Sequence, residues 1–133
     1  MSPDPLVLLG SWSFERVIDD RLGPTRQVAG TTELTRQDDG RVRWSETGTM
    51  TWDGGATEVF RTLFVEARDD GWWVTFDDGR DFHPWSIDQQ VVHPCGADTY
   101  TGRITMDEPQ AWTIVWTVSG PAKDYTMTTR LTR

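Results

Sequence analysis

The sequence contains little cysteine, little lysine and no long apolar run. Its 133 residues include a single cysteine, Cys95, and a single lysine, Lys123. One cysteine excludes an internal disulfide and favours a reducing compartment. No apolar run approaches membrane-spanning length, and residues 5–9 are too short for a signal-peptide core and lack a basic flank. We therefore expect a cytoplasmic protein without a membrane partner.

The charge balance is acidic. The formal net charge is -8 at pH 7 and the isoelectric point is near 4.6. Nucleic-acid binding requires clustered lysine and arginine that release counterions from phosphates, so we expect no nucleic-acid partner. At this length and with a moderate apolar fraction, the chain fits one globular domain over residues 1–133, as a monomer or a homodimer.

Turn signals divide the chain into short strands that alternate apolar and polar residues. Four Asp-Gly pairs, at 39–40, 53–54, 70–71 and 78–79, favour tight hairpins between antiparallel neighbours. Helix is nearly absent, with one turn over residues 5–9. The predicted strands cover residues 11–19, 26–37, 41–52, 56–67, 71–77, 80–88, 98–106, 111–118 and 124–132. About eight to ten strands at this spacing indicate an all-β antiparallel meander that closes into a barrel or a sandwich.

Three charged residues fall on faces that are otherwise apolar. The even-numbered residues of 42–52 share one face, which places Glu46 in the middle of a buried surface. The same alternation turns Arg16 and Arg61 inward. A small barrel filled only by side chains does not normally include three charged groups, whereas a ligand cavity with a few placed polar groups does.

Four motifs carry a resemblance to known proteins. They are GSW over residues 10–12, FDDGRDFH over 76–83, HPCGADTY over 93–100 and WTVSGPAKDY over 116–125. The first resembles the G-x-W that opens the first strand of lipocalins and other calycins. Together the four resemble a family of small calycin-like barrel proteins of unknown function, found as single domains in bacteria, and the resemblance extends from Leu8 to Arg133.

The resemblance implies an up-and-down calycin-like or lipocalin-like barrel with minimal helix. It also implies that Trp12 closes the barrel floor and that an arginine of the last strand, Arg130 or Arg133, packs over it. It implies no activity, because the family has no assigned function. Leu63 stands where the family pattern has an aromatic residue, so the pocket of this chain is expected to differ in shape.

The two histidines are the candidates for proton transfer. A neutral imidazole with an unperturbed pKa of about 6.5 suits a general base at neutral pH. His93 is followed closely by Asp98 and Tyr100, and His83 shares its strand phase with inward apolar residues. The alternative is that each imidazole only hydrogen-bonds a strand end.

The candidates for ligand binding combine rings with charged groups. The aromatic surface comes from Trp44, Trp116 and Tyr125. The charged groups that would orient a ligand are Arg16, Glu46 and Arg61. Lys123 shares a phase with Tyr125, so it either grips a carboxylate or carbonyl oxygen at the barrel mouth or is a solvated edge charge.

The sequence favours neither a metal nor a cofactor. The nearest approach to a metal site, His93 and Cys95 with Asp98, lacks the spacing of a known metal motif. Haem is a further alternative, since some small calycin barrels hold it through one histidine.

Three functions fit these residues. The favoured one is a barrel that binds a small, partly aromatic or apolar organic molecule in its lumen. The second is a cofactor-independent enzyme of isomerase, cyclase or hydratase type, in which a histidine moves a proton and Arg16 or Arg61 stabilises an oxyanion. In the third, Arg16 or Arg61 pairs with Glu46 as a structural network.

Overall fold

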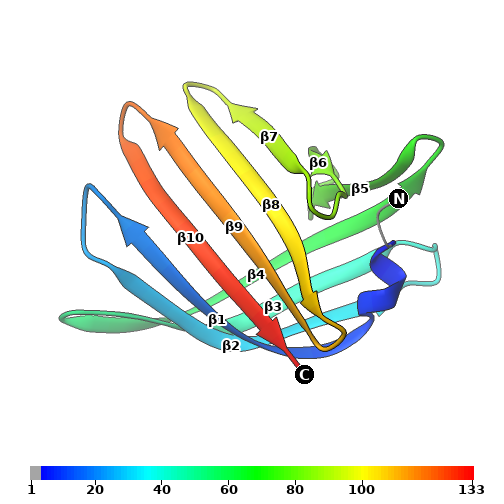
Figure 1. Cartoon of the computed structure of the whole chain (residues 1–133), viewed down its shortest axis with the longest axis horizontal. Coiled ribbons are helices and arrows are strands. Elements are labelled where there is room, and N and C mark those ends of the chain that lie inside the picture. The colour runs from blue at the N-terminus through cyan, green and yellow to red at the C-terminus, as the bar shows by residue number, and fades with distance from the viewer. Residues whose placement is uncertain (1–3) are drawn as a thin grey trace.

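The chain forms one antiparallel sheet that curls into a barrel (Figure 1). The structure, a computed structural model, describes residues 4–133. A 3-10 helix, η1 (Pro5–Leu8), precedes ten strands. The strands are β1 (Gly10–Asp20), β2 (Arg26–Arg36), β3 (Val42–Trp52), β4 (Gly55–Arg68), β5 (Gly71–Phe76), β6 (Asp81–Pro84), β7 (Gln90–Cys95), β8 (Asp98–Glu108), β9 (Ala111–Gly120) and β10 (Lys123–Thr132). The predicted all-β meander is confirmed as a barrel.

The barrel is nearly closed. The strand order is β6-β5-β4-β3-β2-β1-β10-β9-β8-β7, so β1 pairs with β10 and every other pair joins strands that are consecutive in sequence. The two edges, β6 and β7, lie close together without forming a ladder (Figure 1). A seam between these two edges therefore remains in the wall.

Residues 85–88 bridge the seam at one end. The Trp85 amide donates to the Trp72 carbonyl at 2.8 Å, and the Asp88 amide donates to the Ile104 carbonyl at 2.8 Å. Ile87 forms an isolated parallel bridge with Ile104. This segment links β5 to β8, so the seam is held shut here and opens only toward the opposite end of the barrel.

Most predicted strands match the structure, but the region of β6 and β7 was predicted wrongly. The expected strand over 80–88 ends at Pro84, and the strand at 90–95 was missed. Pro94 lies inside that missed strand and cannot donate to a ladder. It is tolerated because β7 pairs only with β8 and its other side faces the seam.

The Asp-Gly turns are confirmed. Each of the four pairs connects two neighbouring strands, and each glycine has a positive φ, between 89° and 126°. L side chains rarely adopt this conformation, which glycine reaches without a steric penalty.

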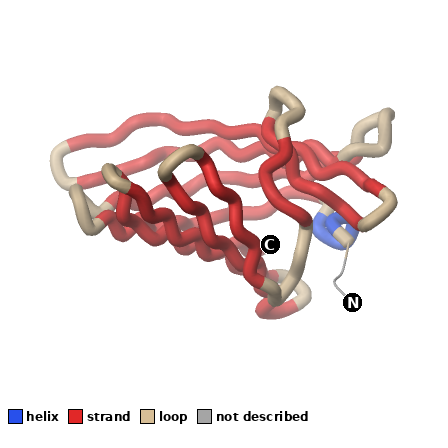
Figure 2. The backbone as a smooth tube through the Cα atoms, turned by 90° about the horizontal axis from the view of Figure 1, so that it is seen from above, coloured by secondary structure: helices blue, strands red, loops and turns tan. Residues whose placement is uncertain are grey.

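Tryptophans fill the end of the barrel beside η1, the short helix drawn in blue in Figure 2. Trp112 is the centre of the cluster, with ring centroids 5.9 Å from Trp12, 5.7 Å from Trp44 and 6.4 Å from Trp85. Trp12 also donates its indole N–H to the Leu8 carbonyl at 2.9 Å. Rings at these spacings pack favourably beyond the area they bury, so this floor is both sealed and stiff.

Candidate functional site

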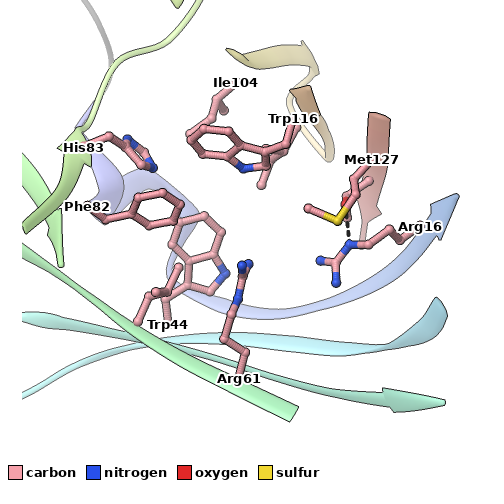
Figure 3. A pocket seen from close by; sticks show the side chains of 11 residues that line it. Arg16, Trp44, Arg61, Phe82, His83, Ile104, Trp116 and Met127 are labelled. Atoms are coloured by element: carbon pink, nitrogen blue, oxygen red, sulfur yellow. Dashed lines mark hydrogen bonds between the residues drawn. The ribbon is translucent and has the colours of Figure 1, made fainter. Parts of the chain in front are cut away.

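Two adjoining cavities lie above the tryptophan floor. The outer one has a volume of about 560 Å³ and is lined by Arg61, Phe76, Arg80, Asp81, Phe82, His93, Pro94, Cys95 and Tyr100. The inner one, about 20 Å³, has room for roughly one water molecule. Its lining includes Arg16, Trp44, Arg61, Phe82, His83, Trp116 and Thr129 (Figure 3). The outer cavity opens where β6 and β7 face each other across the seam.

The Phe82 side chain lines both cavities, as does that of Arg61. The ring lies between two others, 4.6 Å from Phe76 at an interplanar angle of 17° and 5.1 Å from Trp116 at 11°. Gly102 makes room for this stack, since a Cβ there would lie 2.6 Å from the Trp116 ring. The space between the Phe76 and Trp116 rings therefore accommodates a planar group, which in this structure is the Phe82 ring.

Arg16 of β1 and Glu46 of β3 form an ion pair over β2 on the inner face of the barrel. Arg16 Nη1 donates to Glu46 Oε1 at 2.9 Å and Nη2 donates to Oε2 at 3.1 Å. Arg16 Nε donates to the Thr129 hydroxyl at 2.7 Å. Burial raises the pKa of the Glu46 carboxyl, but the charge of Arg61 and the hydrogen bonds and charge of Arg16 outweigh it and hold that pKa below its usual value. Glu46 therefore stays ionised.

Arg61 contributes a second cation to the same site. Its Nε lies 3.8 Å from Glu46 Oε1, beyond hydrogen-bond distance, and its guanidinium points into the space between Trp44 and Arg16 (Figure 3). Burial lowers the pKa of Arg61, Glu46 raises it and Arg16 lowers it. Arginine remains charged at neutral pH despite such shifts. The side chain is 39% exposed, and it lines both cavities.

His83 is a buried, neutral histidine. Its ring is 3% exposed and its Nδ1 lies 2.8 Å from the Pro84 carbonyl, so Nδ1–H donates to that oxygen. Burial lowers the pKa of His83 to about 4, with the Pro84 bond opposing and the charges of His93 and Arg61 assisting. A base this weak is a poor proton acceptor at pH 7.

His93 is half-buried in the wall of the outer cavity. Its ring contacts Phe82 at 5.1 Å and Phe76 at 5.7 Å, which joins the two edges of the seam through aromatic contacts. Within residues 4–133, neither histidine hydrogen-bonds a carboxylate, and Asp98, which follows His93 closely in the sequence, pairs with Lys123 instead.

The remaining predicted residues gather at the rim. Lys123 donates to the Tyr100 hydroxyl at 3.1 Å and pairs with Asp98 at 3.2 Å. The Tyr100 and Asp98 hydrogen bonds raise the pKa of Lys123. Burial, then Tyr100, raises the pKa of Tyr125. Lys123 was expected either to grip a ligand oxygen at the barrel mouth or to be a solvated edge charge, and in the structure its side chain is 42% exposed and paired with Asp98.

The predicted site residues did not include six that line the outer cavity, namely Phe76, Arg80, Asp81, Phe82, Pro94 and Cys95. The first four lie in the motif at 76–83, from which only His83 was a predicted site residue. Cys95 is exposed and also lines this cavity. No group of three His, Cys, Asp or Glu side chains within residues 4–133 has an arrangement that would hold a metal ion. No helix in that range is long and apolar enough to cross a membrane.

A family model of unknown function, DUF6314, matches residues 8–133. The chain belongs to this family. The expected membership of a barrel family without an assigned function is thereby confirmed. No curated protein matches the sequence.

Solved structures share the fold of this DUF6314 chain at low sequence identity. The S-type phycobiliprotein lyase CPES from Guillardia theta has a TM-score of 0.65 at 12% identity, covering 98% of this chain and 90% of the lyase. A Nostoc punctiforme protein of unknown function from the DUF3598 family has a TM-score of 0.54 at 14% identity, covering 98% of this chain and 48% of that one. A redesigned beta barrel, mFAP0, bound to DFHBI, has a TM-score of 0.50 at 22% identity, covering 96% and 99%.

Proposed function

We propose that this chain binds a small, partly aromatic organic molecule in the outer cavity of its barrel. The observation that carries the proposal is the cavity itself. Its volume of about 560 Å³ lies within the range of about 300–1,000 Å³ that is typical of small-molecule sites. Its lining combines three aromatic rings and a histidine with the charged head of Arg61, as ligand sites combine apolar walls with a few placed polar groups.

The structural neighbours support the same class of function. The mFAP0 barrel is described as bound to DFHBI, and the CPES protein is described as a phycobiliprotein lyase. This support is an analogy between folds, and the residues of the cavity carry the argument for this chain.

A second candidate function is proton transfer without a cofactor. It is favoured by the position of His93, which lines the same cavity as the Arg61 guanidinium. Once a substrate has been identified, His93→Gln should abolish turnover and leave the affinity for the substrate within about threefold of the wild-type value.

Native mass spectrometry, with an absorption spectrum, tests lumen binding. The protein is purified at low salt from the organism that encodes it, and we expect an extra mass that disappears on denaturation. A Soret band would identify the ligand as haem and would replace the proposed ligand class. A chain that carries no extra mass and binds no aromatic compound in titrations would contradict the proposal.

A matched pair of variants locates the bound molecule. His93→Trp places a larger ring in the cavity mouth and should remove the extra mass. Val92→Trp makes the same change one residue earlier, on the outer face, where Val92 is 52% exposed. It should leave the extra mass unchanged. Equal behaviour of the two variants would place the ligand outside the outer cavity.

A further inference from the structure

The lumen carries one more positive charge than negative charge, although the whole chain has a net charge of -8. At its centre lie Arg16, Glu46 and Arg61. Arg16 occupies both Glu46 oxygens through its two hydrogen bonds. At the rim, Lys123 and Asp98 neutralise each other. The cation without an equivalent anion is Arg61.

The Arg61 guanidinium also has N–H donors that are not used within residues 4–133. Within residues 4–133 its guanidinium makes no hydrogen bond, and its one ion-pair contact is the 3.8 Å approach to Glu46. A guanidinium has five N–H donors in a planar fork that matches a carboxylate. Because the side chain faces the outer cavity, these donors are available to a molecule that enters it.

The acidic groups at the cavity mouth are turned away from Arg61. Asp81 accepts two hydrogen bonds from Arg68, at 2.6 and 3.3 Å. Asp78 accepts from Arg80 Nε at 2.7 Å. No carboxylate other than Glu46 pairs with Arg61 within residues 4–133. The chain therefore provides a cation in the lumen and leaves the complementary anion to come from outside.

A second donor points the same way. The Trp44 indole N–H is buried, belongs to a residue that is 5% exposed, and has no hydrogen-bond partner within the described chain. Trp44 lines the inner cavity beside Arg61 (Figure 3). A buried donor without a partner is destabilising, and an incoming acceptor would relieve that cost.

We infer that the lumen ligand is an aromatic anion whose carboxylate, or an equivalent oxyanion, binds Arg61. The ring system of the ligand lies against Phe76, Phe82 and Tyr100, and the acidic group is directed to the inner end of the outer cavity. This inference rests on the proposed function and adds the chemical class of the ligand. Arg16 and Glu46 then have a structural role: they hold the lumen polar and leave Arg61 free.

Three naphthalenes of equal ring size test the inference. They are 2-naphthoate, 2-naphthamide and 2-naphthylmethylammonium, titrated against the wild-type chain at pH 7.5 by calorimetry. We expect the carboxylate to bind at least about tenfold more tightly than the amide, and the ammonium to bind most weakly, because a charge-assisted pair is roughly twice as strong as a neutral hydrogen bond. Equal binding of carboxylate and amide would overturn the inference and leave lumen binding intact.

Variants assign the preference to Arg61. Arg61→Gln should weaken 2-naphthoate by about tenfold or more and change 2-naphthamide by less than about threefold. Arg130→Gln is the control, since the Arg130 side chain is 50% exposed, pairs with Asp107 and lines neither cavity. It should keep the preference. If Arg61→Gln does not fold, Arg61→Lys keeps the charge without the fork and should reduce the preference. An unchanged preference in the Arg61 variants overturns the inference, and failure of all three compounds to bind counts against lumen binding itself.

Discussion

Arg16 of β1 and Glu46 of β3 are bound to each other by two parallel hydrogen bonds, of 2.9 and 3.1 Å, over β2 on the inner face of the barrel. Their side chains are 12% and 9% exposed. Removing one partner of such a pair leaves a buried charge uncompensated, whereas removing both costs far less. The ion pair therefore has a structural role. Removing one partner should change the stability of the fold, whereas removing a ligand anchor should change mainly the affinity for the ligand.

Arg16→Met should lower the free energy of unfolding by about 3 kcal/mol, and Arg16→Met with Glu46→Leu should recover most of that loss. Urea denaturation of the two single variants and the double variant measures the coupling. The loss for Arg16→Met should lie at the lower end of the range of about 3–5 kcal/mol for a broken buried ion pair. The reason is that Arg61, 3.8 Å from Glu46, still compensates part of its charge. A loss under about 1 kcal/mol for Arg16→Met would show that the pair is not structural.

Arg133 packs over Trp12, as the resemblance implied for one of two arginines. Its guanidinium lies 4.0 Å from the Trp12 ring centroid, and its Nη1 donates to the Leu9 carbonyl at 2.7 Å. Arg133→Ala should cost about 1–2 kcal/mol, because a cation–π contact and a hydrogen bond are both lost. Arg130→Ala is the control, since Arg130 pairs with Asp107 and Glu108 on the exposed surface. It should cost less than about 0.5 kcal/mol in the same thermal and urea unfolding experiments. Equal losses would contradict the role given to Arg133.

Strand alternation predicted which charged residues face the lumen, but not which of them pair. Arg16, Glu46 and Arg61 all lie inside, as their phase indicated. The alternation of side chains along a strand assigns each residue to a face, but it does not determine the side-chain rotamer. The sequence alone therefore could not show whether Arg16 or Arg61 is the hydrogen-bonded partner of Glu46.

Alternation failed at β6, where Phe82 and the next residue, His83, both line the inner cavity. A register shift between Val74 and Thr75 in the β5–β6 pairing breaks the simple phase there. Phe60 and Phe64 lie on the outer face, where Phe60 is 85% exposed and the Arg41 guanidinium lies 4.2 Å from the Phe64 ring centroid.

The protein should become less stable as the pH is lowered from 6.5 toward 4, because His83 is buried in its neutral form. Burial, the first cause, lowers its folded pKa to about 4, from an ordinary value of 6.5. The unfolded chain therefore binds more protons between these values. The stability from neutral His83 is fully present above about pH 6.5 and is lost as the pH falls toward 4, at up to about 1.4 kcal/mol per pH unit.

Urea denaturation between pH 4.5 and 7 measures this slope. His83→Gln should flatten it, because the buried group no longer titrates. His93→Gln removes the other histidine, which is half-buried, and should leave the slope in place. If both variants keep the wild-type slope, the acid sensitivity comes from groups other than His83.

Phe82 should set the size limit of the site, because its side chain lines both the inner and the outer cavity. Phe82→Ala removes this ring and should strengthen binding of pyrene-1-carboxylate relative to 2-naphthoate by roughly tenfold, as the larger ring system buries additional apolar surface against Trp116. Phe76→Ala removes a ring from the same stack but lines only the outer cavity, so it should not change this ratio. Both variants lose a stacked ring and should lose stability by about 2–3 kcal/mol. The affinity for pyrene-1-carboxylate relative to 2-naphthoate is therefore compared between the two variants. If this ratio changes equally in both, Phe82 is an ordinary part of the aromatic lining and does not limit the size of the ligand.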